Sequence, residues 1–84
     1  MSTTFESLVM VDGAEANRIL QSIDEQGEEA VFANLCSNFE PGSGTLITTR
    51  SEPWSAAEHI YANGEFVMYY DNRKETVGLV CILN

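Results

Sequence analysis

The sequence predicts a single α+β domain over residues 1–84, in which an antiparallel sheet of five or six strands carries one principal helix on one face. The chain has only 84 residues, which is a typical size for one small domain. One segment has helical periodicity, whereas the other apolar runs are short and are separated by turn-forming residues. Strands and helices do not alternate as a parallel sheet requires, so we expect the order β-α-β-β-(β)-β-β.

The first two elements are a strand and the principal helix. Residues 5–11 are mostly apolar and predict a strand. Asp12 followed by Glu15 is typical of a capping box at a helix start, and Gly27 is a typical helix stop, so we expect a helix over 13–26. One face of that helix carries apolar side chains at i, i+3, i+4 and i+7, namely Ala16, Ile19, Leu20 and Ile23.

The rest of the chain predicts β-structure. Apolar runs indicate strands at 29–36, 45–50, 59–70 and 76–83. Asn63-Gly64 interrupts the third run and indicates a hairpin within it. The polar stretches 37–44 and 71–75 are rich in turn formers. The pattern leaves open whether 54–62 is a strand or a short helix.

The strands are apolar on both faces, which one helix cannot cover. In 76–83, for example, Val77 and Leu79 have one parity while Val80 and Ile82 have the other. We therefore expect some apolar sheet surface to stay open, as in a partner site or a self-association face.

The charge narrows the classes of partner. Thirteen acidic residues against four basic ones give a net charge of -9, which repels nucleic acid and anionic membranes and attracts a basic protein. A solvated acidic surface is the plainer explanation of the same charge. No apolar run approaches the roughly 20 residues of a membrane span, so we expect no membrane association.

Features of catalysis, metal binding and cofactor binding are sparse, so we expect no enzyme, no metal and no cofactor. His59 is the only histidine, and nothing places it in a nucleophile–histidine–acid arrangement. Cys36 and Cys81 lie far apart in apolar stretches without a CxxC motif, which indicates free buried thiols in a reducing cytoplasm. Trp54 either anchors an interface or plugs the end of the sheet.

The run Glu6-Ser7-Leu8-Val9-Met10 resembles the Glu-Ser-Ile strand of the bacteriophage uracil-DNA glycosylase inhibitors, a family of DNA-mimic proteins. In addition, the Ser-Glu-Pro turn at 51–53 is similar to the family's Ser-Asp-x-Pro turn, and 66–83 is similar to its closing hairpin. Three features depart from the family: only four residues precede the strand, the helix after it has fewer acids, and 54–64 looks inserted.

The resemblance implies a monomeric inhibitor that binds uracil-DNA glycosylase 1:1 in the bacterial host's cytoplasm, without binding nucleic acid itself. Glu6 and Ser7 would stand where DNA phosphates sit, with Glu52 and Glu15 as further acidic contacts. A pocket between sheet and helix would receive the enzyme's apolar intercalating side chain. Its expected lining is Leu8, Met10, Ala16, Ile19, Leu20, Val31, Leu46 and Val67.

Other interpretations stay open. The protein could be another phage-encoded acidic anti-defence or immunity protein that blocks a nucleic-acid-binding enzyme, or a small dimerising module. The helical apolar stripe is also ordinary core in any α+β domain, and Glu6 and Ser7 could be solvent-facing residues of an edge strand.

Overall fold

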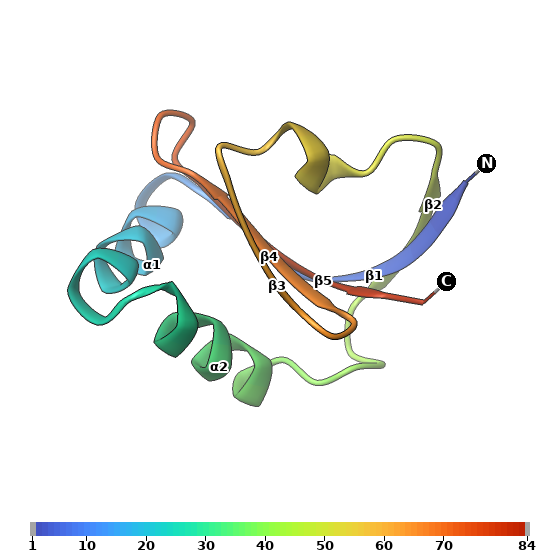
Figure 1. The fold of residues 1–84 in the computed structure, drawn as a ribbon, viewed down its shortest axis with the longest axis horizontal. Helices are drawn as coiled ribbons and strands as arrows, with labels where there is room; N and C mark the ends of the chain where they lie inside the picture. The colour runs from blue at the N-terminus through green and yellow to red at the C-terminus, as the bar shows by residue number, and fades with distance from the viewer. Residues whose placement is uncertain (1, 84) are drawn as a thin grey trace.

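A computed structural model, which describes residues 2–83, confirms the α+β class: a five-stranded antiparallel sheet carries two packed helices on one face (Figure 1). The sheet order is β2-β1-β5-β4-β3, so the first strand lies inside the sheet and is not an edge strand. The elements in chain order are β1 (Thr3–Asp12), α1 (Gly13–Gln26), α2 (Glu28–Asn38), β2 (Thr45–Thr49), the 3₁₀ helix η1 (Pro53–Ala56), β3 (His59–Asn63), β4 (Phe66–Asp71) and β5 (Thr76–Ile82).

The predicted principal helix is α1, but it begins differently from the prediction. Asp12 occupies the N-cap position, yet its side chain makes no capping hydrogen bond, so the predicted capping box does not form. The chain turns from β1 into α1 at Gly13, whose φ of 61° suits glycine. Gly27 ends α1 as predicted, with φ of 93° and its N–H donating to the Ile23 carbonyl.

The prediction of a strand at 29–36 is wrong, because this segment forms most of α2. Its apolar residues recur with helical spacing, and Val31, Phe32 and Leu35 are the buried ones. Glu28 and Glu29 lie in the first turn, where carboxylates interact favourably with the helix dipole. The sheet therefore carries two helices on this face rather than one.

The predicted hairpin forms between β3 and β4. Asn63 pairs with Phe66, which leaves Gly64 and Glu65 as the two-residue loop, with φ of 64° at Gly64. The segment 54–62, whose type the pattern left open, contains the greater part of both η1 and β3.

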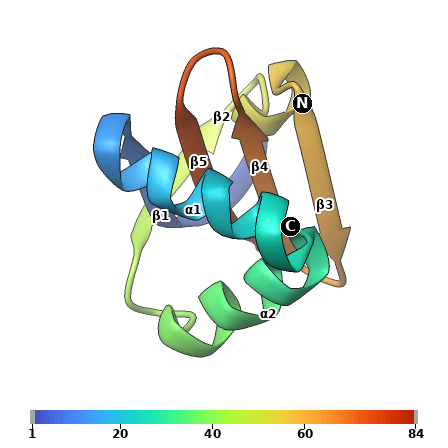
Figure 2. The ribbon, with the colours of Figure 1, turned by 90° about the vertical axis from the view of Figure 1, so that its left-hand side faces the viewer.

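Apolar clusters lie on both faces of the sheet. On the helix side, α1 crosses in front of β1, β5 and β4 while α2 lies closer to β3 (Figure 2). The buried residues of this cluster are Val9, Ala16, Leu20, Val31, Phe32, Leu35, Met68, Tyr70, Val77 and Leu79. On the other face, the buried Trp54 of η1 packs edge-on against Phe5, with ring centroids 5.1 Å apart. Trp54 thus covers Phe5 on the face of the sheet opposite the helices, in agreement with the structural role expected for it.

Candidate partner-binding site

The space between the sheet and the helices is filled by the protein's own side chains. Ala16, Leu20 and Val31, three residues of the expected pocket, are 0%, 6% and 6% exposed. Leu8 and Ile19 are partly buried against the same cluster. These five residues therefore come together, but as a packed core rather than as an open pocket.

The other three residues of the expected pocket lie elsewhere. Val67 is buried on the opposite face of the sheet, in the cluster of Phe5 and Trp54. Met10 is 61% exposed, and its sulfur accepts a hydrogen bond from the Tyr69 hydroxyl at 3.8 Å. Leu46 is 67% exposed on β2. The pocket expected from the resemblance is therefore not assembled by these residues.

Glu6 is buried inside the domain, with only 4% of its surface exposed. Its two carboxylate oxygens accept hydrogen bonds from the Gly42 N–H at 2.8 and 2.9 Å and from the Gly44 N–H at 3.1 Å. Gly44 approaches β1 so closely that a Cβ there would lie 2.2 Å from the Ser7 carbonyl oxygen. The carboxylate thus anchors the loop that precedes β2, and it does not form an exposed acidic edge.

The remaining polar candidates do not share a surface with Glu6. Ser7 is half-buried in β1, between Thr45 of β2 and Val80 of β5. Glu15 is exposed in the first turn of α1. Glu52 precedes η1, which packs on the other face of the sheet.

A groove of about 630 Å³ between α2 and the β3–β4 hairpin combines an apolar floor with acidic edges. Phe32 and Tyr61 meet in the floor, with ring centroids 4.9 Å apart and planes inclined by 58°. The full lining is Glu29, Phe32, Ala33, Cys36, Tyr61, Asn63, Gly64, Glu65 and Phe66. Its volume is within the usual range of ligand pockets, so it has room for a partner's side chain.

Exposed carboxylates border this groove. Glu29 lies on α2 and Glu65 lies in the hairpin loop, and both are exposed. The segment Asp24–Glu29 also contains Glu25 and Glu28 and has no basic residue. The groove therefore offers an apolar surface beside concentrated negative charge, which suits an apolar side chain carried by a basic surface.

A helical interpretation of 29–36 would have revealed this groove. Glu29, Phe32, Ala33 and Cys36 follow at i, i+3, i+4 and i+7, so on a helix they share one face. Interpreting the segment as a strand placed these residues on alternating faces. The helical spacing of these four residues is therefore present in the sequence.

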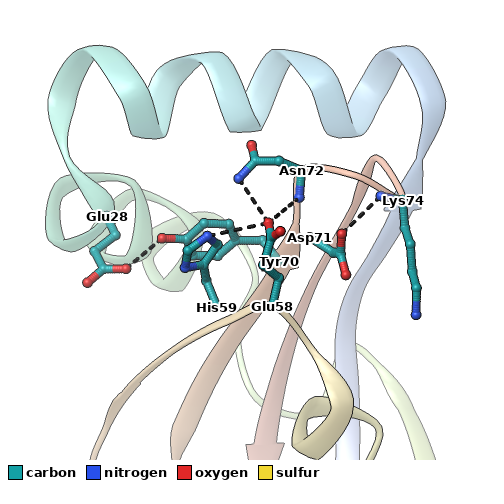
Figure 3. A network of polar contacts seen from close by, with 7 residues as sticks. All are labelled: Glu28, Glu58, His59, Tyr70, Asp71, Asn72 and Lys74. Atoms are coloured by element: carbon teal, nitrogen blue, oxygen red, sulfur yellow. Dashed lines mark hydrogen bonds and ion pairs between the residues drawn. The ribbon is translucent and has the colours of Figure 1, made fainter.

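A polar network holds the start of α2 against the sheet (Figure 3). The Tyr70 hydroxyl donates to Glu28 Oε2 at 2.7 Å, and the His59 ring stacks on Tyr70 at 4.9 Å. Burial, followed by the hydrogen bond and charge of Glu28 and the charge of Asp24, raises the pKa of Tyr70 to about 12. Tyr70 therefore stays protonated and donates to Glu28 at neutral pH. Glu58 lies beside His59 and accepts hydrogen bonds from Asn72.

Both cysteines are free thiols, but only Cys81 is buried as expected, because Cys36 is half-buried at the groove. Burial, and to a smaller extent Cys81, raises the pKa of Cys36, while burial followed by Glu65 and Glu6 raises that of Cys81. Both therefore remain thiols near neutral pH, and Cys36 contributes apolar surface to the groove. Within residues 2–83, no group of three or more His, Cys, Asp or Glu side chains is arranged to hold a metal ion. No helix of that part is both long and apolar enough to cross a membrane.

Comparison with family models, curated proteins and solved structures found no match to this chain. The likeness to uracil-DNA glycosylase inhibitors therefore depends on the motifs quoted from the sequence.

Proposed function

We propose that the protein is an acidic inhibitor that occupies the DNA-binding groove of a nucleic-acid enzyme in the bacterial cytoplasm, with uracil-DNA glycosylase as its target. The observation that carries this proposal is the groove between α2 and the β3–β4 hairpin, where an apolar floor meets exposed carboxylates. The net charge of -9 supports the same class of partner, because a DNA-binding groove is basic.

The two parts of the groove match two needs of a protein that replaces DNA. A base-flipping enzyme grips phosphates and acts on a base that has left the stack. Glu29 and Glu65 offer carboxylates to the groups that would grip phosphates. Phe32, Tyr61 and Phe66 offer apolar surface to a side chain placed against them, and burying a leucine-sized side chain there contributes about 1.5–3 kcal/mol.

The proposed contact surface differs from the one that the resemblance implies. Glu6 has its oxygens directed at backbone N–H groups of the neighbouring loop, so it supports the fold and leaves the contacts to other acids. Glu29 and Glu65 take the role first expected of Glu6 and Ser7. The enzyme's apolar intercalating side chain would enter the groove beside α2, because the core beneath α1 is already filled.

A uracil-excision assay with purified bacterial uracil-DNA glycosylase tests the function. We expect activity to fall linearly with added protein and to reach its minimum at one chain per enzyme. If a large excess of the folded protein leaves uracil excision unchanged, the proposed target is wrong. If nuclease assays with the same protein then show inhibition, another acidic anti-defence function replaces it.

Two matched pairs of variants test the groove. Ala33 lines the groove, whereas Ala30 is exposed on α2 outside the lining, so Ala33→Trp should fill the groove and Ala30→Trp should not. We expect only Ala33→Trp to raise the inhibitor concentration needed for half-maximal inhibition. The expected increase is about tenfold or more, which corresponds to about 1.4 kcal/mol of binding free energy. Likewise Glu29→Lys should weaken inhibition, whereas Glu52→Lys, on the other side of the sheet, should have little effect. The reverse order would place the contact at the Ser-Glu-Pro turn.

A further inference from the structure

The strand β2 forms one end of the sheet, and neither charge nor proline protects this edge. Residues 42–49 contain no charged residue, although the chain has 13 acids, and 45–49 contain no proline. Leu46 is 67% exposed on the helix side, and Ile47 is 37% exposed on the other side. Exposed edges with unprotected β-prone residues pair readily with another strand.

The opposite edge of the sheet is protected. β3 packs against α2, where Tyr61 contacts Phe32. Glu58 precedes β3 and His59 begins it, so charge and a titratable group stand at that edge. The two edges therefore differ in what covers them, because α2 packs against one face of β3 whereas both faces of β2 carry exposed apolar side chains.

We propose that β2 pairs in an antiparallel manner with β2 of a second copy of this chain, so that the two sheets become one across a two-fold axis. This inference goes beyond the proposed function, and it replaces the expectation of a monomeric free protein. The register that pairs the whole of Thr45–Thr49 with itself places Ile47 on the axis, and it sets Leu46 beside Thr48 of the other copy.

Charge complementarity favours a second copy in this register. The same register, continued one residue beyond each end of β2, sets Arg50 of each copy opposite Gly44 of the other. Gly44 donates to the Glu6 carboxylate, which lies in the wall of a hollow of about 320 Å³. This hollow is lined by Glu6, Pro41, Gly42, Gly44, Leu46 and Leu83. The aliphatic stem of Arg50 covers the apolar part of the hollow, and its guanidinium approaches Glu6.

The acids of the groove beside α2 and the proposed dimer contact lie in different parts of the molecule. β2 and β3 stand at opposite ends of the sheet, and β2 lies far from α2 in Figure 1. Residues 42–49 contain no acid, so two strongly acidic copies can meet there with less repulsion than at the acidic surfaces. The groove beside α2 stays open, so each copy in the dimer can bind its own target.

Sedimentation of the protein alone tests the proposal, and the glycosylase is absent, so its outcome is independent of the proposed function. We expect a monomer–dimer equilibrium between micromolar and near-millimolar concentration. Arg50→Glu should weaken the dimer about tenfold or more, because it places a carboxylate beside Glu6. Arg73→Glu makes the same charge change in the turn after β4 and should alter the dissociation constant less than about twofold.

A second pair of variants tests whether Ile47 lies on the two-fold axis. Ile47→Lys places two lysines opposite each other, where like charges destabilise a cross-strand pair, and should give a monomer. Ile60→Lys changes an exposed residue of β3 and should leave the dimer intact. Amide exchange within 45–49 should slow as wild-type concentration rises, which confirms the contact without any substitution. A wild-type monomer throughout, or equal effects of both members of a pair, would overturn the proposal.

Discussion

Replacing Glu6 separates a structural role of this carboxylate from a role in partner binding. Glu6→Ala removes the acceptor of the Gly42 and Gly44 N–H groups. Those donors lie in the loop that leads into β2, and Gly44 is close against the Ser7 backbone. Without the carboxylate, the two N–H groups must either remain unpaired or draw the loop away from β1 toward water.

The size of the loss follows from the number of donors. Two hydrogen bonds to a charged group contribute about 1.5–3 kcal/mol each, and the solvent-exposed loop can recover part of this by hydration. We therefore expect the free energy of unfolding to fall by about 2–3 kcal/mol. For a domain of this size the corresponding decrease in Tm is about 10–20 °C.

Thermal and urea denaturation monitored by circular dichroism measure this loss. Glu6→Gln keeps one acceptor oxygen and should lose about half as much as Glu6→Ala. Glu40→Gln makes the same change at an exposed acid of the neighbouring loop and should cost less than about 0.5 kcal/mol. At temperatures where the variants are folded, we expect inhibition to be preserved. An unchanged Tm together with lost inhibition would show that Glu6 contacts the partner and would refute this reasoning.

Three further predictions concern the fold around the site. The pKa of Tyr70 is raised from 10.0 to about 12, so its contribution to stability is complete below pH 10 and is lost as the pH rises to 12. Tyr70→Phe should remove this decline in urea titrations. An unchanged decline would exclude Tyr70 as its source. Trp54→Ala should lower the free energy of unfolding by about 3–5 kcal/mol in denaturant titrations, because Trp54 covers Phe5. A loss below about 1 kcal/mol would show that Trp54 is not part of the core. Gly78→Ala would place a Cβ 2.3 Å from Cζ of Tyr69 and should lower the Tm, whereas an unchanged Tm would show that the Tyr69 ring can move aside.

The sequence was sufficient for the elements whose signals are local. The helical stripe of α1 and the stop at Gly27 predict Gly13–Gln26 correctly. The Asn63-Gly64 pair predicts the β3–β4 hairpin, although the loop itself is Gly64-Glu65. In each case the residues that decide the structure are within a few positions of one another.

Two errors had identifiable physical origins. In 29–36 the buried residues fit a short strand as well as a helix, and the choice of period decided the prediction. The burial of Glu6 depends on Gly42 and Gly44, which are distant in the sequence and fold back over β1. No local pattern around Glu6 predicts such a contact, so an acid in an apolar strand was interpreted as an exposed binding residue.

Hydrogen exchange of this chain, with and without excess uracil-DNA glycosylase, tests the central claim most directly, because amide protection reports which backbone a partner covers. We predict new protection in 29–36 and 63–66, which form the groove beside α2. Protection confined to 3–9 and 51–53 would place the partner on the motif strand and the Ser-Glu-Pro turn instead. An exchange pattern identical with and without the enzyme would contradict the binding altogether.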